Sequence, residues 1–431
     1  MTDTTAGTLK RDVTVIGLVS GGHFMSHYFS TMLPPLFPFL HSDLGVSYTL
    51  LGLLLSAKNL TSGTMQLPAG ILVDKYGAKS LLIAGFAIMT LCYFIFSIAT
   101  NFWVMAAFIL LAGCGNAVFH PADYSILNGS ISESRIGRSF SAHTFSGNLG
   151  DALAPVVILT AATIWNWRVG ILISCVVSVG LLLAMLTQWK RLEEGDAKAA
   201  AKKKAEEPKA AEVQTTDQAV AAAEREAEMT TWQTVKQVML SPPMLFLFLF
   251  FALQQLGSGG FRNWAVAGLV ELHQTPVAIA GGALTGFLFA SAFGVLAGGV
   301  VADKNSRHDF VAGGALLLTA VLAVIVGSFD LSTVVLVCVF SLAGWGQGMI
   351  RPARDMMIRA ASPKGSIGKA FGFVFSGQAI GGTIAPVVFG AMIDMGAPAW
   401  VFYSSAVFMV ICMLAVLGSA WQARKMTAAG Q

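Results

Sequence analysis

Gly113-Cys-Gly-Asn-Ala-Val-Phe-His-Pro-Ala-Asp123 returns 231 residues later as Gly344-Trp-Gly-Gln-Gly-Met-Ile-Arg-Pro-Ala-Arg354. The match continues at the same offset without a gap, through the pairs Gly137 and Gly368, Phe140 and Phe371, Gly150 and Gly381, and Pro155 and Pro386. The chain is therefore predicted to hold two copies of one structural unit. Repeats of this kind are typical of membrane proteins whose ligand site lies at the interface of the two copies.

The composition indicates an integral membrane protein. Hydrophobic residues make up 55% of the 431-residue chain, charged residues make up 12%, and the mean hydropathy is +0.69. A soluble domain holds about 25% charged residues. The net charge of +4 comes without a basic stripe interleaved with aromatics, which argues against a nucleic-acid surface. The five cysteines fall in apolar stretches and show neither metal nor disulfide spacing.

Twelve apolar stretches are long enough to cross a membrane as helices, because about 20 residues span a hydrocarbon core of about 30 Å. They are expected at 13–38, 47–72, 80–100, 102–128, 138–161, 168–189, 242–270, 276–301, 309–329, 332–360, 368–394 and 398–421. The predicted fold is an all-α integral membrane protein with 12 transmembrane helices in two pseudo-symmetric six-helix bundles.

Polar stretches divide this chain into five segments. We expect a tail, a first bundle, a linker rich in Ala, Lys and Glu, a second bundle and a second tail at 1–12, 13–189, 190–240, 241–422 and 423–431. The linker is expected to be a solvated tether, with partner binding as the alternative. The polar first residues and the long first apolar segment argue against a cleavable signal peptide.

Lysine and arginine occupy alternate short loops, which predicts the orientation in the membrane. The basic loops carry Lys75 and Lys79, Arg135 and Arg138, Lys304 and Arg307, and Lys364 and Lys369. The opposite loops hold only Arg168. We therefore expect a bacterial-type inner membrane protein with both termini and the 190–240 linker in the cytoplasm.

The loop after the second predicted helix reads Gly70-Ile-Leu-Val-Asp74-Lys75-Tyr-Gly77-Ala-Lys79. It resembles the G-x-x-x-D-[RK]-x-G-x-[RK] signature of the major facilitator superfamily, and the twelve expected spans agree with that family over nearly the whole chain. The glycines permit a tight turn, and the acid can pair with a cation or a helix N-terminus. A weaker copy lies 229 residues later. The predicted gating residues are Asp74, Lys75, Asp303 and Lys304.

Within that superfamily the sequence is similar to the fosmidomycin-resistance-like group. The similar stretches are Gly22-His-Phe-Met-Ser-His27, Leu33-Pro-Pro-Leu-Phe-Pro-Phe-Leu40, Leu44-Gly-Val-Ser-Tyr48 and Phe119-His-Pro-Ala122. The resemblance implies a transporter, and drug efflux is the label of that group. Its first helix often carries an acid where this chain has His27, so a proton-linked carboxylate is not transferred to that position.

Ionisable side chains inside the predicted spans are candidates for the functional site, because a charge at membrane depth is costly and usually faces a cavity or a partner. Fixed cations and histidines exceed the deep acids, which favours an anionic substrate. The predicted substrate-binding residues are His23, His27, Lys58, Asn59, His120, Arg262 and Arg351. The planar guanidinium of Arg351 suits a carboxylate, phosphate or phosphonate. For the two histidines of the first helix, neutral packing is the alternative.

Asp151 is an addition to the repeated template, because Gly382 stands at the equivalent position. A carboxylate in a low-dielectric environment can exchange protons near neutrality, so Asp151 is the first candidate for proton coupling, ahead of His27. The alternative is a structural role for Asp151 as the partner of His143 or Lys58.

Asp123 and Arg354 are equivalent in the repeat, and an internal salt bridge between them competes with a role in substrate binding. Glu271 and Asp394 lie near the outer ends of their spans. No zinc spacing, nucleotide loop or nucleophile elbow occurs, so we expect no metal, no cofactor and no enzymatic activity.

These observations predict a secondary active transporter that moves a small organic anion or drug-like molecule by alternating access, coupled to protons as an antiporter or symporter. Its partners are the substrate, protons and the lipid bilayer, without nucleic acid, and a monomer is expected. The alternative is a membrane receptor or scaffold on a transporter fold that performs no net transport.

Overall fold

The computed structural model describes residues 2–192, 241–304, 307–362 and 367–429, and all regular elements in these ranges are helices. The first set is α1 (Thr2–Thr31), η1 (Pro34–Leu36), α2 (Phe37–Leu44), α3 (Tyr48–Tyr76), α4 (Ala78–Ile98), α5 (Phe102–Ala117), α6 (Phe119–Ser130), α7 (Glu133–Ile164), α8 (Trp167–Thr187) and η2 (Trp189–Arg191). The second set is α12 (Pro242–Arg262), α13 (Ala265–His273), α14 (Val277–Lys304), α15 (His308–Ser328), α16 (Thr333–Ala361), α17 (Ile367–Asp394) and α18 (Ala399–Ala429).

Ten helical segments of the described chain are long and apolar enough to cross a membrane. The expected spans 13–38 and 47–72 are not among these ten, although α1 and α3 occupy them with 30 and 29 residues. Both helices carry charged residues near their ends and polar residues at mid-length, which lowers their hydropathy. The all-helical membrane fold is confirmed, while the count of twelve spans remains a prediction.

The segment boundaries also remain predictions. Helix α1 already begins at Thr2 and α18 continues to Ala429, so helical structure extends into both expected tails. Apart from 190–192, the expected linker lies outside the described residues.

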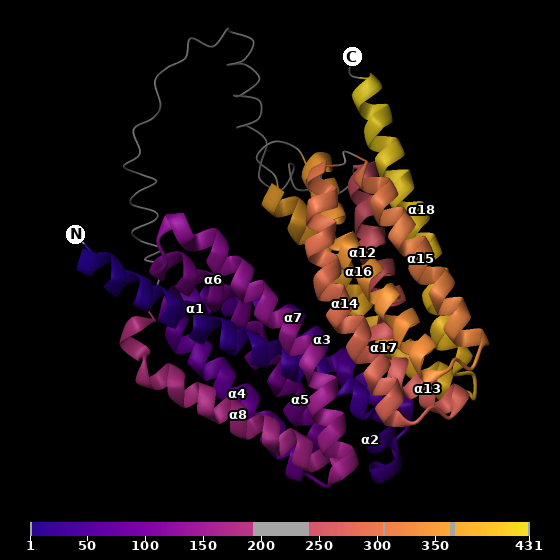
Figure 1. Ribbon diagram of the computed structural model, residues 1–431, viewed down its shortest axis with the longest axis horizontal. Coiled ribbons are helices and arrows are strands. Elements are labelled where there is room, and N and C mark those ends of the chain that lie inside the picture. Colours follow the sequence, from indigo (N-terminus) through magenta and orange to yellow (C-terminus); the bar gives the residue numbers. More distant parts are fainter. Residues whose placement is uncertain (1, 193–240, 305–306, 363–366, 430–431) are drawn as a thin grey trace.

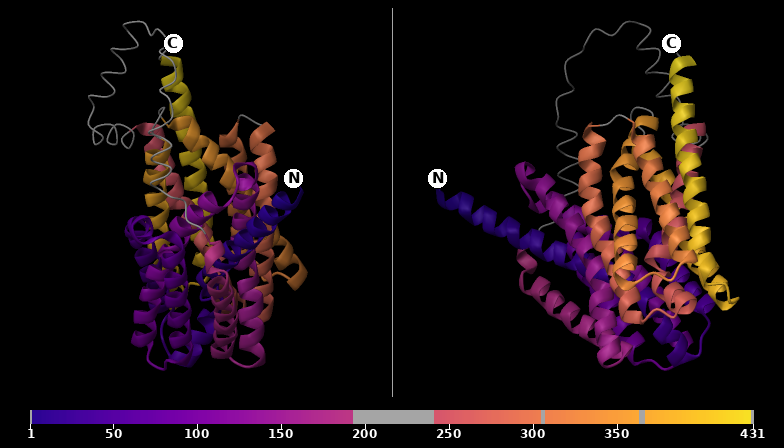
Figure 2. Two further views of the ribbon diagram at one scale, coloured as in Figure 1. Left: turned by 90° about the vertical axis from the view of Figure 1, so that its left-hand side faces the viewer. Right: turned by 45° about the vertical axis from the view of Figure 1, so that its right-hand side comes forward.

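Two sets of helices lie side by side (Figure 1), with α1–α8 in indigo to magenta and α12–α18 in red, orange and yellow. Within the first set α1 packs against α7 and α4 against α5, and within the second α14 packs against α16 and α12 against α18. The sets are joined mainly by α3 with α17 and by α7 with α14, and α13 adds contacts with α2 and η1. Figure 1 and the right-hand view of Figure 2 show the sets spreading apart toward the end that holds the two chain termini. We call this the terminus end and the opposite one the Asp394 end.

Close helix packing repeats between the two sets as the sequence repeat predicts. A Cβ atom at Gly113 would lie 2.8 Å from the carbonyl oxygen of Lys58, and one at Gly344 would clash with the carbonyl oxygen of Phe287. Lys58 and Phe287 are themselves related by the 229-residue offset of the weaker repeat. Each set therefore packs its α5 or α16 glycine against the same point of the neighbouring helix.

The turn between α3 and α4 explains the second glycine of the Gly70–Lys79 signature. Gly77 connects the two helices alone, with φ of 92° and ψ of 139°. This region of φ strains any residue that has a Cβ atom. The predicted tight turn is therefore confirmed, and a substitution at Gly77 would strain it.

The first long helix of each set stops at equivalent positions, since α1 ends at Thr31 and α12 ends at Arg262, 231 residues later. Pro34 and Pro35 follow the first break, and a proline cannot continue a helix because it lacks the backbone N–H. The two terminal residues meet across the interface, where Arg262 Nη2 donates to Thr31 Oγ1 at 3.3 Å. The symmetry axis of the repeat thus passes close to this contact.

At the Asp394 end the two sets are joined by polar contacts. The backbone N–H groups of Tyr48 and Thr49 donate to the Asp394 carboxylate at 2.9 and 2.7 Å, and the Tyr48 hydroxyl donates to Glu271 Oε1 at 2.7 Å. Asp394 therefore caps the N-terminus of α3 from the other set, where the helix dipole favours a negative charge. Phe37 and Trp264 add a ring contact with centroids 5.0 Å apart.

Candidate functional site

A cavity of about 1320 Å³ lies between the two sets of helices. Its polar lining comes from both sets, and it reaches from Thr31 and Arg262 toward the terminus end at Gln66 and Gly372. The predicted residues that line it are His27, Lys58, Asn59, His120, Asp151, Arg262 and Arg351, together with Arg354. The structure thus gathers six of the seven predicted substrate-binding residues on one surface.

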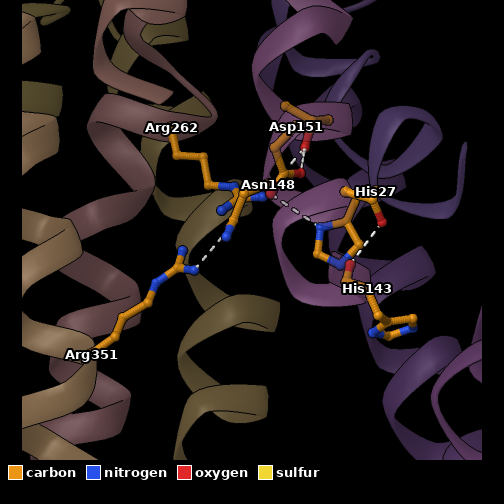
Figure 3. A network of polar contacts seen from close by, with 8 residues as sticks. His27, His143, Asn148, Asp151, Arg262 and Arg351 are labelled. Atoms are coloured by element: carbon orange, nitrogen blue, oxygen red, sulfur yellow. Dashed lines mark hydrogen bonds and ion pairs between the residues drawn. The ribbon is translucent and has the colours of Figure 1, made fainter. Parts of the chain in front are cut away.

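Arg351 faces this cavity from α16. Its Nη1 donates to the side-chain oxygen of Asn148 on α7 at 3.3 Å, and Figure 3 shows the guanidinium directed at that amide. No carboxylate lies within ion-pair distance of Arg351 in the described part of the chain. The guanidinium therefore retains donors for a ligand anion.

Asp151 and Arg262 form an ion pair that joins the two sets, with Oδ1 and Nη2 2.8 Å apart. The same carboxylate accepts a hydrogen bond from Thr31, and its Oδ2 lies 3.1 Å from Nδ1 of His27 (Figure 3). His143 and Lys58 were the expected alternative partners of Asp151, but neither lies within ion-pair distance of its carboxylate. Asp151 thus connects a titratable imidazole in the first set to a permanent cation in the second.

Lys58 lines the cavity with only 3% of its surface exposed. It has no ion-pair partner among the described residues, although Asp151 acts on it at longer range. A buried ammonium group without a carboxylate is costly at membrane depth. The neighbouring Asn59 donates to the carbonyl oxygen of Gly382 on α17 at 3.0 Å, so in this conformation its amide links the two sets.

His23 does not line the cavity, which corrects its predicted place at the substrate site. It lies behind His27 in a buried cluster with Asp123 and His143, which we call the buried triad. Nε2 of His143 donates to Oδ2 of Asp123 at 3.0 Å, and Nδ1 of His23 lies 3.3 Å from the same oxygen. One ring nitrogen of each histidine and one carboxylate oxygen of Asp123 all lie within 4.8 Å of one another. This cluster could not be predicted from the sequence, because its members are distant in the chain.

The predicted salt bridge between Asp123 and Arg354 is wrong for this structure. Each residue instead contacts the first long helix of its own set: Asp123 contacts His23, and Arg354 Nη1 donates to Gln254 Oε1 at 3.1 Å. His23 and Gln254 are themselves related by the 231-residue offset. The repeat thus places Asp123 and Arg354 in equivalent local packing, each against the first long helix of its own set and away from the other.

The predicted gating residues lie at the terminus end, outside the cavity lining. Asp74 and Lys75 form the last turn of α3 and Asp303 and Lys304 that of α14, all with exposed side chains. None of the ion pairs of the described chain links them across the interface. A latch at this end would be open here, where the sets are apart, and the gating role remains a prediction.

Several cavity residues were not among the candidates. Asn148 contacts Arg351. Gln254, which accepts a hydrogen bond from Arg354, donates in turn to Gln347 at 3.3 Å. Gln347 and Asn116 are equivalent in the repeat, and both line the cavity. Their place within the repeated glycine stretch could have indicated them, but neutral amides carry no charge that makes them stand out in an apolar helix.

Two repeated sets of membrane-crossing helices around a polar, cation-rich cavity define a multi-pass membrane protein of two-repeat architecture. The family model described as Major Facilitator Superfamily matches residues 19–267 and 255–428. The chain belongs to the Major Facilitator Superfamily, as its Gly70–Lys79 signature predicted.

Relatives in this family have different functions. The fosmidomycin resistance protein of Escherichia coli (strain K12) is 24% identical over 177 residues, which cover 41% of this chain and 43% of the relative. A probable L-galactonate transporter of that species is 27% identical over 146 residues, covering 34% and 32%. The membrane sensor protein UhpC of the same species is 23% identical over 257 residues, which cover 59% of this chain and 56% of the relative. The matched stretches thus span between about a third and somewhat more than half of these relatives.

A solved structure agrees over nearly the whole length. A bacterial homolog of the human lysosomal transporter Spinster, in an inward-facing and unoccupied conformation, matches with a TM-score of 0.71 at 15% identity. The match covers 97% of each chain. At this identity the likeness concerns the fold alone.

Proposed function

We propose that this protein is a secondary active transporter that carries a small organic anion across the bacterial inner membrane by alternating access, coupled to protons. The observation that supports it most is the placement of Lys58 and Arg351. They face one cavity from opposite sets, and neither has an acidic partner within ion-pair distance in the described chain. A cavity with this surplus of cations attracts anions.

The other two cavity cations are already neutralised. Arg262 is paired with Asp151, and Arg354 Nε lies 3.3 Å from Asp355 Oδ1. An incoming carboxylate, phosphate or phosphonate would therefore meet Lys58 on α3 and Arg351 on α16. By contacting both residues, it would draw the two sets together. The bound anion would then favour a conformation with the sets closer over one with the sets apart, and a ligand shifts a conformational equilibrium only through such a difference in affinity. The cavity exceeds the usual ligand pocket of about 300–1,000 Å³, so drug-like anions fit as well.

Alternating access agrees with the unequal ends of the interface. The Asp394 end is held by the cap on α3, whereas the cavity extends toward the terminus end. With both termini in the cytoplasm, as the loop charges predict, this conformation opens inward. The opposite conformation would break the Asp394 contacts and bring Asp74 and Asp303 close to the other set.

Proton coupling is assigned to Asp151 and His27. A substrate anion near Arg262 competes with Asp151 for its guanidinium, and a protonated His27 competes with Arg262 for Asp151. Charge on His27 therefore alters how firmly the two sets are joined. Antiport and symport both use this linkage and differ only in the step at which the proton leaves.

The test begins with a thermal-shift screen of the purified protein against small carboxylates, phosphonates and hydrophobic drugs, because a ligand of the native state raises its apparent stability. Hits are then assayed for counterflow in liposomes. Stabilisation by anions with counterflow supports the proposal, and stabilisation by uncharged drugs alone contradicts the anion assignment.

The relative UhpC gives a reason to keep the second function, a membrane sensor or scaffold on this fold. A sensor would bind an anion in the same cavity without exchanging it. Anion binding without counterflow, together with capture of a protein partner by the 190–240 segment, would favour it.

A further inference from the structure

We propose that the buried triad His23, Asp123 and His143 is a binding site for a single proton that is exchanged with the cavity through His27. Its transport role depends on the proposed proton coupling, but its existence does not. The three side chains come from α1, α6 and α7, and they are 3%, 0% and 1% exposed.

The charge balance of the triad demands a proton. Asp123 contacts no lysine or arginine in the described chain, so a carboxylate with two neutral imidazoles would be a buried, uncompensated negative charge. Such a charge is strongly disfavoured in a low-dielectric interior. A proton that forms an N–H bond on one imidazole changes the total charge from −1 to 0.

A second proton is disfavoured for the opposite reason. The rings of His23 and His143 are stacked, with centroids 3.7 Å apart and planes inclined by 23°. Protonation of both would place two cations face to face and give the triad a net positive charge. Groups that interact this strongly release their protons in separate steps that belong to the pair. The triad therefore holds one proton over a wide range of pH.

Unused hydrogen-bonding capacity supports this assignment. Oδ1 of Asp123 and Nδ1 of His143 are buried without a hydrogen-bond partner, and Nδ1 of His23 has only its 3.3 Å contact with Oδ2 of Asp123. Buried polar atoms are normally satisfied, so such exceptions in one cluster call for an explanation. A proton that moves between the rings requires nitrogen atoms that are not permanently engaged.

The same donor atoms are close enough for a metal ion, but the ring orientation disfavours one. A metal bound at about 2.0–2.1 Å lies in the plane of each imidazole ligand. Two stacked and nearly parallel rings cannot both contain the same ion in their planes. A proton has no such requirement.

His27 connects the triad to the cavity. Its ring centroid lies 4.6 Å from that of His23, its side chain is 30% exposed, and its Nδ1 faces Asp151. The other titratable groups facing the triad are His120, with a ring 5.2 Å from His23, and Tyr124, with a ring 5.6 Å from His143. Helix α8 faces this part of α1 with apolar side chains, Leu181 and Met185. Protons thus reach the triad from the cavity side.

The experiment is nitrogen-15 NMR of the full-length protein in liposomes, with ring-labelled histidine and no substrate. Ring nitrogen shifts distinguish imidazolium from neutral imidazole. His23→Gln and His143→Gln assign the two signals, and His41→Gln assigns a control histidine outside the cluster. We expect one imidazolium shared by His23 and His143 from about pH 5 to about pH 8, with signals distinct from that of His41.

Asp123→Asn should abolish the shared imidazolium, because the negative charge that holds it is gone. Two rings that titrate independently, or two rings neutral throughout, would overturn the proposal, and so would a Zn²⁺-induced shift of both rings with loss of the imidazolium. If Asp123→Asn does not fold, the wild-type titration decides alone. A shared proton in a protein whose transport ignores the pH gradient would keep the site and refute the coupling.

Discussion

The two sets of helices differ most at positions where the repeat makes them equivalent. His120 and Asp123 in α6 correspond to Arg351 and Arg354 in α16, so titratable groups in the first set stand where the second set has permanent cations. The neighbours match as well: His23 contacts Asp123 as Gln254 contacts Arg354. One template thus carries titratable side chains in the first set and permanent cations at the equivalent positions of the second. Asp151 and Arg262 join them across the interface.

This difference teaches that backbone packing and side-chain chemistry vary independently. The glycines that let helices approach are kept in both sets, as at Gly113 and Gly344. The charged positions differ between the sets, and Asp123 and Arg354 each contact a partner in their own set and not their repeat equivalent. A duplicated fold can therefore carry different ionisable groups in its two halves.

The largest expected effect concerns the anion side. Arg351→Ala should abolish anion transport, with anion affinity reduced about 30-fold or more, because losing one partner of a buried charge contact costs about 2 kcal/mol or more. Arg351→Lys should keep part of the activity, since it retains the charge but loses the planar fork. Affinity is measured by thermal shift and transport by liposome uptake. Arg359→Ala, an exposed arginine on the same helix, is the control. Unchanged affinity in Arg351→Ala would remove this residue from the site.

The next effect concerns the proton side. Asp151→Asn should lower net transport driven by a pH gradient at least about tenfold, while substrate-for-substrate exchange continues, because the loaded carrier moves without releasing a proton. If His27 is the carrier, His27→Gln shows this phenotype instead, and His41→Gln serves as the control for both. Normal gradient-driven transport in both variants would reject coupling at this pair. The same conclusion follows if an ionophore that collapses the gradient leaves wild-type transport unchanged.

A smaller effect is expected at the Asp394 end, which the two sets close together. Asp394→Ala removes the cap on α3 and should cost about 1 kcal/mol, a shift of roughly fivefold toward the conformation open at this end. Spin labels on α2 and α13 in a cysteine-free background report the separation. Asp330→Ala, an exposed acid in the loop after α15, should leave the distance distribution unchanged. Equal distributions in both variants would show that the cap does not hold this end.

The smallest effect is a coupling expected to be near zero. In a double-mutant cycle on stability, Asp123→Asn and Arg354→Gln should add within about 0.5 kcal/mol, because the residues have separate partners. Asp151→Asn with Arg262→Gln should instead show a coupling of about 0.5–3 kcal/mol. A large coupling in the first cycle would mean that Asp123 and Arg354 meet in another conformation of the transport cycle.

The sequence alone determined the membrane fold, the two-copy organisation and the charged residues of the cavity lining. Hydropathy and glycine spacing are local properties, and a charge at membrane depth must face a cavity or a partner, so Lys58 and Arg351 could be placed without coordinates. The Gly70–Lys79 signature further identified the family, now confirmed.

Only the tertiary structure decided which charge meets which. It paired Asp151 with Arg262, placed Asp123 with two histidines and moved His23 away from the cavity. The physical reason is that pairing depends on how far each helix is rotated about its axis and how closely it approaches its neighbour. Residues distant in the chain, such as the members of the buried triad, carry no mark in the sequence of their meeting. Helix packing brings them within a few ångströms.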